Sequence, residues 1–502
     1  MRHHSHQSES SQHRDPTSNP HSGIDLHGRA ERAVREAGFK TEFTPEAMQE
    51  AANFDVATPH LPDVVDLREL LWSSIDNEES RDLDQVEYCQ RLDNEHILVR
   101  VGIADVASRV LVGSAIDRHA EWNTCSIYTG VQTFPMLPER LSTDLTSLVE
   151  GEDRLAVVID LTVDQRGEIV GTKVCRAQVR NQAKLVYETI GDWLDGQTPV
   201  PSEVTRIAGL EEQLRLQWEV ATRLLEQRQR NGALDVEPRE VRPVVVNGKV
   251  IDLVVPHKNV ARLIIENFMV SINMALAQFL KSKHLPVIQR VVREPERWPR
   301  IVELAHPYGV TLPPQPDARA LSAFLSAQRR AAPQQFADLS LSVVKLLGRG
   351  EYVVVQGAQD KGGHFGLGMH HYAHSTAPNR RFPDLVTQRI VQAAISGAAL
   401  PYSVDELASI AAHCTEREAA AQKAERLMRK VEAATLFGDR IGQIFTAVVT
   451  GASRKGTYVR TAAPAVEGRL SCGERDFDVG DRVQVRLTST NPERGFIDFS
   501  CA

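Results

Sequence analysis

A crowded group of aspartates is the feature that most limits how this chain can fold. Asp76, Asp82 and Asp84 fall within nine residues, directly after the apolar stretch Leu70-Leu71-Trp72. In extended backbone Asp82 and Asp84 leave the same face, and a loop through residues 77–80 can return Asp76 to their side. These carboxylates repel one another unless cations offset them, and hard oxygen ligands at this spacing suit Mg²⁺. The run predicts phosphodiester chemistry on one or two metal ions, although a solvated acidic loop is the other reading that its composition allows.

A pair of arginines far downstream favours the metal site. Pro378 biases Ala377 away from helical backbone, and residues 384–399 are apolar at helical spacing. Arg380 and Arg381 therefore lie at a turn that enters a helix, where guanidinium groups can grip a phosphate. We expect these cations to act together with the aspartates.

Several further motifs follow one another in a recognisable order. They are Ile103-Ala104-Asp105-Val106, Ser126-Ile127-Tyr128, Pro135-Met136-Leu137-Pro138-Glu139-Arg140-Leu141-Ser142, Lys184-Leu185-Val186-Tyr187, Gly232-Ala233-Leu234, Leu263-Ile264-Ile265-Glu266-Asn267-Phe268-Met269 with Asn273, and Ala424-Glu425-Arg426. With the aspartates and arginines, they make the chain from about Val64 to the C-terminus resemble the RNB-type exoribonucleases, the family of ribonuclease II and ribonuclease R. Chance does not explain this order, so we interpret the aspartates as a metal site.

The resemblance implies hydrolysis of single-stranded RNA from the 3′ end, one nucleotide at a time, with release of nucleoside 5′-monophosphates. It implies that Asp76, Asp82 and Asp84 bind Mg²⁺, as one or two ions, with Mn²⁺ as a substitute. Asp82, Asp84 and Arg380 are the implied catalytic residues. Arg380 would hold the scissile phosphate, and Arg381 would have a structural role.

The resemblance also implies side chains that contact the RNA. Tyr187 and Glu266 match positions at the terminal ribose, where a carboxylate accepting from the 2′-hydroxyl favours RNA over DNA. Tyr128 matches a tyrosine that stacks near the last nucleotides, and Glu425 matches an acid at the end of the RNA channel.

Three departures from the family pattern are visible. The acidic motif usually ends in Asp-Asp, whereas Gln85 follows Asp84 here, so metal affinity falls unless Glu78 or Glu79 substitutes. Val236 stands where the family often has an aromatic residue that stacks on RNA. Only about seventy residues precede Asp76, so we expect the two N-terminal cold-shock domains of ribonucleases II and R to be lacking.

Element patterns predict an α+β (mixed α/β) catalytic domain over residues 64–436. Strands over 96–103 and 155–163 alternate with long helices over 211–228 and 260–281. Before this domain we expect a disordered polar tail over 1–23 and a short helical element over 24–63. Helices over 30–38 and 45–54, the second capped by Thr44, fit either a helix-turn-helix-like unit or a simple packing element.

The last part of the chain, 437–502, predicts a five-stranded OB-fold barrel that binds RNA, similar to the repeated domain of ribosomal protein S-one. Lys455, Tyr458 and Arg460 are candidates to contact RNA, because aromatic rings stack bases while cations follow the backbone. Phe445 and Phe499 are expected in the core. The expected strands cover residues 444–449, 456–459, 468–470, 482–487 and 495–499.

Composition indicates a large protein of the cytoplasm. The chain has 502 residues, 42% of them apolar, which is ample for two or more domains. Six scattered cysteines indicate neither a disulfide framework nor a zinc site. No apolar run approaches a membrane-spanning helix and no signal-peptide core is present, so no membrane contact is expected. The net charge of −8 does not favour RNA binding, although Mg²⁺ would match part of it.

Other signals lead to weaker expectations. The glycines near residue 365 lack the spacing of a phosphate loop, so no nucleotide cofactor is implied. His370, His371 and His374 are assigned structural roles. We expect a monomer. Two rival functions stay open: a catalytically weakened RNB-like RNA-binding protein, which Gln85 favours, and a DNA-directed phosphodiesterase, which Tyr187 and Glu266 oppose.

Overall fold

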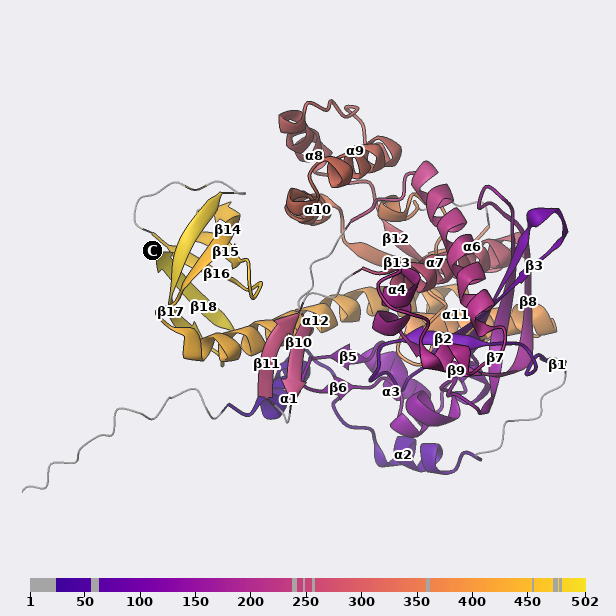
Figure 1. Ribbon diagram of the computed structural model, residues 1–502. Coiled ribbons are helices and arrows are strands. Elements are labelled where there is room, and N and C mark those ends of the chain that lie inside the picture. The colour runs from indigo at the N-terminus through magenta and orange to yellow at the C-terminus, as the bar shows by residue number, and fades with distance from the viewer. Residues whose placement is uncertain are drawn as a thin grey trace, which may run out of the picture. The chain divides into compact units, whose positions relative to one another are not determined.

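The computed structural model describes residues 24–55, 63–236, 242–246, 249–254, 258–357, 362–453, 456–472, 477 and 481–502 (Figure 1). The chain divides into two compact units. The larger unit contains Glu31–Arg242 and Val254–Arg426. The smaller unit contains the chain up to Ala30, Pro243–Leu253 and Leu427–Ala502. Lys455 lies outside the described residues.

A seven-stranded mixed sheet organises the larger unit, with strand order β1-β8-β7-β4-β3-β2-β9. All neighbours are antiparallel except β1 with β8 and β2 with β9. The strands are β1 Val64–Asp66, β2 Ser73–Asp76, β3 Gln85–Arg91, β4 Ile97–Ala104, β7 Asp153–Val163, β8 Ile169–Arg180 and β9 Ala183–Val186.

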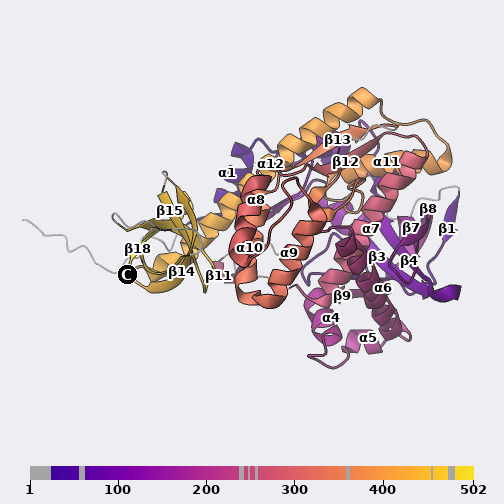
Figure 2. The ribbon, with the colours of Figure 1, turned by 90° about the horizontal axis from the view of Figure 1, so that it is seen from above.

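Helices and short strands surround this sheet. α6 packs on α7 and also contacts β3 and β4 (Figure 2). The two-stranded pairs are β5 Ile127–Tyr128 with β6 Thr133–Phe134, and β12 Val287–Val292 with β13 Gly350–Val355. The helices are α2 Pro45–Ala52, α3 Ala115–Asn123, α4 Tyr187–Leu194, α5 Ser202–Thr205, α6 Leu210–Arg230, α7 Val260–Ser282, α8 Trp298–Ala305, α9 Ala318–Ala331, α10 Pro333–Leu346 and α11 Phe382–Ser396. Two more helices, α1 Leu26–Glu36 and α12 Val404–Phe437, have residues in both units.

Helix α7 is long and apolar, which corrects the expectation that no apolar run approaches the length of a membrane-spanning helix. By length and composition it could cross a membrane, with a mean hydropathy of 1.5 over its most apolar window. In the fold, 67% of that window is buried, and Phe268 and Ile264 lie in the main core. The apolar run therefore serves as a core helix, which the sequence alone does not distinguish from a spanning one.

The N-terminal helices lie close to where the sequence predicts them. Thr44 caps α2, since its Oγ1 accepts a hydrogen bond of 3.3 Å from the amide of Ala47. Ala47 and Ala51 are buried in the main core, and α2 packs against α3. The burial of α2 in the main core favours the packing element over the helix-turn-helix-like unit.

The smaller unit contains a closed five-stranded barrel with strand order β14-β15-β16-β18-β17. Its core includes Phe445 and Phe499, as expected, and Phe437 of α12 stacks on Phe445 at 5.3 Å between ring centroids. The mixed α/β body and the five-stranded barrel predicted from the sequence are thus confirmed. The strands are β14 Ile444–Ser453, β15 Gly456–Thr461, β16 Glu467–Ser471, β17 Arg482–Asn491 and β18 Phe496–Cys501; a separate pair is β10 Arg242–Val246 with β11 Lys249–Val254.

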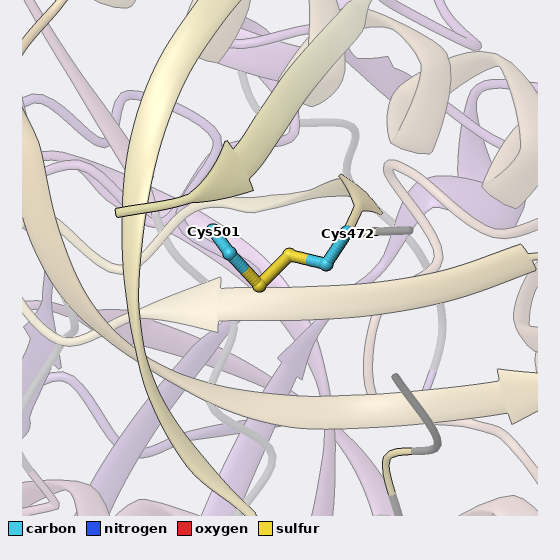
Figure 3. The surroundings of a disulfide bond; sticks show 2 residues. All are labelled: Cys472 and Cys501. Carbon is cyan, nitrogen blue, oxygen red and sulfur yellow. A yellow bond between two sulfur atoms is a disulfide. The ribbon is translucent and has the colours of Figure 1, made fainter. Parts of the chain in front are cut away.

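The cysteines of the barrel correct a second expectation. Cys472 and Cys501 form a disulfide, shown in Figure 3. β16 and β18 pair in parallel with Ser471 opposite Ser500, so the next residues of both strands meet with Cα atoms 5.3 Å apart. The partners are 29 residues apart in sequence, so their spacing carries no sign of this pairing. Among the described residues the other four cysteines are free, namely Cys89, Cys125, Cys175 and Cys414.

Glu432 of α12 leads to a stability prediction. Its side chain is fully buried, and neither carboxylate oxygen has a hydrogen-bond partner within the described ranges. Burial raises the pKa of Glu432 from 4.5 to about 8, and Arg429 only partly opposes this. Between those values the unfolded chain releases the proton that the folded chain keeps, so stability falls as pH rises towards 8.

We expect Glu432→Gln to remove the loss of stability that Glu432 causes as pH rises. The melting temperature of the variant should equal that of the wild type near pH 4 and exceed it at pH 9 by about 2 °C or more. Thermal melts across this range, with the exposed Glu416→Gln of the same helix as control, measure the difference. An equal melting temperature at pH 9 would contradict an ionised, unpartnered Glu432.

Candidate active site

The loop between β2 and β3 presents the first aspartate. Asp76 ends β2, and its Oδ1 accepts hydrogen bonds from the amide of Asn77 and the hydroxyl of Ser80, both at 2.7 Å. Lys184 of β9 donates from Nζ to the carbonyls of Glu78 and Ser80, at 2.9 and 2.7 Å. The loop predicted over 77–80 is therefore closed by its own side chains and tied to the neighbouring strand.

The segment that carries the other two aspartates is fixed by the backbone around it. Ser147 donates to the carbonyl of Arg81 at 2.7 Å and accepts from the amide of Leu83 at 2.9 Å. The amide of Ala104 donates to the carbonyl of Asp84 at 2.9 Å. Ser147 was not singled out in the sequence, because only the fold brings it to this segment.

Asp84 and Arg380 form the centre of the site. Nε of Arg380 donates to Oδ2 of Asp84 at 2.9 Å, and the amide of Asn379 donates to Oδ1 at 3.2 Å. Asp84 is 1% exposed, whereas 43% of the Arg380 side chain stays exposed. Burial raises the pKa of Asp84 to about 6, against the opposing charge of Arg380. The site thus joins a buried carboxylate to an arginine whose side chain is partly exposed.

Asp82 is less buried than Asp84. Its Oδ2 accepts a hydrogen bond of 3.2 Å from the hydroxyl of Tyr128, and the amide of Tyr128 donates to Oε1 of Glu425 at 3.0 Å. Burial raises the pKa of Asp82, while Arg380 opposes the shift. Tyr128 is therefore bonded directly to a predicted metal ligand, and Glu425 is linked to that ligand only through the backbone of Tyr128.

Tyr187 lies at the same end of the sheet as Asp76, because Val186, the residue before it, pairs with Asp76. It is the first residue of α4 and follows β9, the parallel neighbour of β2. The guanidinium of Arg262 lies over its ring, 4.3 Å from the centroid, and donates to Oδ1 of Asn77 at 3.2 Å. Burial, followed by the negative charge of Asp76, raises the pKa of Tyr187. Arg262 was missed in the sequence, although its place four residues before Glu266 on one helix face could have marked it.

Glu266 lies on α7, as Arg262 does, and its ion-pair partners lie outside this helix and are cations, not the aspartates. Its carboxylate lies 3.6 Å from Arg228 and 3.6 Å from Lys258. Val236, where an aromatic residue is common in the family, packs against the core formed by α8, α9 and α10. The remaining predicted RNA contacts within the described residues, Tyr458 and Arg460, lie on β15 of the smaller unit.

Structural roles agree with the contacts of the neighbouring side chains. Arg381 pairs with the buried Asp384 at 2.7 Å. His374 is bonded to the hydroxyl of Tyr352 at 2.8 Å, and His371 to Nζ of Lys281 at 2.7 Å.

The donor set suits a hard divalent cation. Asp76, Asp82 and Asp84 supply carboxylate oxygens only, and Mg²⁺ prefers such ligands together with water. Glu87 is buried, which together with the charge of Asp76 raises its pKa, and neither of its carboxylate oxygens is hydrogen-bonded by a described residue. In the part of the chain that the structure describes, no three acidic, histidine or cysteine side chains converge on one point. The chemistry of these donors fits a hard divalent cation, which water would help to coordinate.

Comparison with known proteins identifies both units. The RNB domain matches residues 64–397, and the RNase II-type exonuclease C-terminal S1 domain matches residues 443–502. Ribonuclease R of Thermotoga maritima is 30% identical, with 91% of this chain and 68% of that protein covered. Ribonuclease R of Escherichia coli is 27% identical, with 87% and 57% covered.

A solved structure has the same fold. Mycoplasma genitalium RNase R in complex with ribose-methylated single-stranded RNA is similar with a TM-score of 0.86 and 22% identity, covering 95% of this chain and 78% of that one. The RNB match spans more than half of the chain and includes every aspartate and arginine of the site. The chain therefore belongs to the RNB family of ribonucleases and carries the C-terminal S1 domain of its RNase II-type members.

Proposed function

We propose that the protein is a Mg²⁺-dependent 3′-to-5′ exoribonuclease that hydrolyses single-stranded RNA to nucleoside 5′-monophosphates. The observation that carries the proposal is the pair of a buried Asp84 and a partly exposed Arg380 beside Asp82. Exoribonucleases of this family generally depend on divalent metal ions. The similarity to ribonucleases R supports RNA as the substrate.

Arg380 is suited to hold the scissile phosphate. Asp84 engages Nε only, and no hydrogen bond from the described residues occupies the two terminal nitrogens. Water attacks the phosphorus of the last phosphodiester and the bond to the 3′ oxygen of the preceding nucleotide breaks. Negative charge then grows on the phosphate oxygens, which a planar guanidinium can bind with two parallel hydrogen bonds. Mg²⁺, held by Asp76, Asp82 and Asp84, would lower the pKa of water and offset charge on phosphate.

The aromatic residues are suited to orient the terminal nucleotides. The Tyr128 side chain is held by Asp82 and its amide by Glu425, and 43% of the residue stays exposed for stacking. Tyr187 and Glu266 are proposed to contact the terminal ribose, with Glu266 accepting from the 2′-hydroxyl. This contact would favour RNA over DNA.

The barrel offers an aromatic surface for single strands. Tyr458 is 41% exposed and lies opposite Arg469, which in turn lies opposite Asp498 of β18. Phe496 is two residues before Asp498, so it lies on the same outer face, and it is 55% exposed. Bases can stack on these two rings while Arg469 faces the phosphates.

We expect Tyr458→Ala to weaken RNA binding by about 1–3 kcal/mol, the usual contribution of one stacked base. Turnover at saturating RNA should change little, because Tyr458 belongs to the barrel and not to the hydrolytic site. Fluorescence anisotropy with a labelled oligoribonucleotide measures the loss. Tyr458→Phe is the matched control, since it keeps the ring, and equal affinity in the alanine variant would remove Tyr458 from the RNA surface.

One digestion series tests the proposed reaction. A 5′-labelled single-stranded oligoribonucleotide should shorten one nucleotide at a time with Mg²⁺ and stay intact with EDTA, while the matched DNA oligonucleotide resists. The released product should be nucleoside 5′-monophosphate. Internal cleavage, equal digestion of DNA, or unchanged activity in EDTA would each contradict the proposal.

Gln85 favours a second candidate, an RNA-binding protein with weakened catalysis. The side chain stands at the start of β3, directly after Asp84, where the family usually has another acid. Tight binding of the oligoribonucleotide without release of mononucleotides, at any concentration of Mg²⁺ or Mn²⁺, would support this candidate over the enzyme.

A further inference from the structure

Glu87 of β3 is a buried acid that the assigned site does not use. Its side chain is 0% exposed, and neither carboxylate oxygen has a hydrogen-bond partner among the described residues. The residue opposite on β2 is Ser73, whose hydroxyl is also buried and unpartnered. An apolar side chain would fill such a place without the cost of desolvating a carboxyl group. The acid therefore needs a reason other than packing.

The position of Glu87 relates it to the metal ligands. Gln85 and Glu87 are alternate residues of one strand, so they face the same side of the sheet. Gln85 occupies the place of the missing family acid, and Glu87 is the next residue on that face. Burial, followed by the negative charge of Asp76, raises the pKa of Glu87. Besides burial, the charges of Asp76 and Glu87 both raise the pKa of Tyr187, so the three side chains lie close to one another.

The two acids considered from the sequence as substitutes do not have this character. Glu78 and Glu79 are both exposed on the loop. The loop backbone at Glu78 is turned towards Lys184, which bonds its carbonyl. Burial and lack of partners single out Glu87 instead.

We propose that Glu87 supplies the negative charge that Gln85 no longer provides, and that it helps to bind the divalent cation held by Asp76. Residues two apart on a strand are separated by about 6.6 Å. One water molecule between the Glu87 carboxylate and the cation can span this extra distance, because Mg²⁺ characteristically keeps several bound waters. The inference rests on the proposed metal-dependent function.

The test measures Mn²⁺ and Mg²⁺ binding to the full chain by calorimetry, without RNA. We expect Glu87→Leu and Glu87→Gln each to weaken Mn²⁺ binding by roughly 10- to 100-fold, the range observed when a side chain that supports a metal site is lost. Moving the acid back in the double variant Gln85→Asp/Glu87→Leu should restore affinity. Glu69→Gln, at an exposed acid just before β2, should bind Mn²⁺ as the wild type does.

A second measurement separates metal binding from folding. Melting temperatures in EDTA should be equal or higher for Glu87→Leu, because an apolar side chain replaces a buried acid without partners. The stabilisation of the wild type by added Mn²⁺ should shrink in the single variants and return in the double variant. If Glu87→Leu disturbs the fold, the Mn²⁺ affinity of the nearly isosteric Glu87→Gln variant tests the role of Glu87.

Two outcomes would overturn the inference in different ways. In the first outcome, both single variants bind Mn²⁺ as tightly as the wild type, while the wild type digests RNA only when metal is present. This result would reject the metal-binding role of Glu87 and leave the proposed function intact. Absence of both metal binding and metal-dependent digestion in the wild type would reject the proposed function, and the role of Glu87 with it.

Discussion

Asp84→Asn should abolish RNA hydrolysis while leaving RNA binding intact. The change keeps the shape of the side chain but removes the charge that faces Arg380 at 2.9 Å and would face the metal ion. We expect kcat to fall by roughly 10³- to 10⁴-fold, the scale observed when a buried catalytic carboxylate is neutralised. Affinity should hold or increase, because Arg380 without its anion is free to pair with RNA phosphate. Single-turnover digestion and anisotropy measure the two effects.

Asp160→Asn provides the control for this variant. Asp160 is also paired with an arginine, Arg100, at 2.6 Å, but it lies within β7 and not in the segment of aspartates between β2 and β3. Its neutralisation should leave kcat near the wild-type value. Comparable turnover of Asp84→Asn and wild type at saturating Mg²⁺ would remove Asp84 from the metal site.

Arg380→Ala should lower kcat by about 10²- to 10³-fold, the usual effect of removing one donor that stabilises transition-state charge. The effect should appear in kcat more than in KM, because the phosphate gains charge as the bond to the leaving oxygen breaks. Removal of the guanidinium also leaves Asp84 buried without its counter-charge. Metal binding is therefore expected to be maintained or strengthened, since a cation can pair with Asp84.

Arg380→Lys separates charge from geometry. Lysine keeps the positive charge but lacks the planar fork, so it should recover only part of the activity. A loss confined to KM in Arg380→Ala would make this residue a general RNA-binding group, with equal contacts in the ground state and the transition state. Full activity in Arg380→Lys would show that charge alone is needed.

The order of motifs and the strand patterns were enough to predict the architecture. The aspartates, the arginine turn and the intervening motifs lie in short local stretches whose spacing is visible in the chain, and the five barrel strands alternate between Gly-rich turns. The strands and long helices formed close to these positions, and Thr44 caps α2 as expected. Local preferences decide these features, because turns, caps and alternation depend on near neighbours.

Contacts between distant segments could not be predicted in this way. The pairing of β16 with β18 joins Cys472 to Cys501, and the packing of α7 in the core makes an apolar helix a structural one. Arg262 reaches the site only because α7 lies beside α4. The disulfide pairing and the burial of α7 leave no trace in residue spacing, and the spacing of Arg262 from Glu266 marks a shared helix face but not its contact with Tyr187, since each contact depends on which surfaces pack together.

For the site, too, some properties can be predicted from the sequence and others depend on the tertiary structure. Residue types and their order predict three metal-binding aspartates and a phosphate-binding arginine, because a reaction on phosphodiesters requires carboxylates and cations wherever they lie. Tertiary structure alone decides that Asp84 is buried while the Arg380 side chain is partly exposed. It also decides that Glu87 is buried close to Asp76 with no hydrogen-bond partner in the described part of the chain. Burial and electrostatic coupling are properties of the packed sheet, so they arise only when β2, β3 and the arginine turn come together.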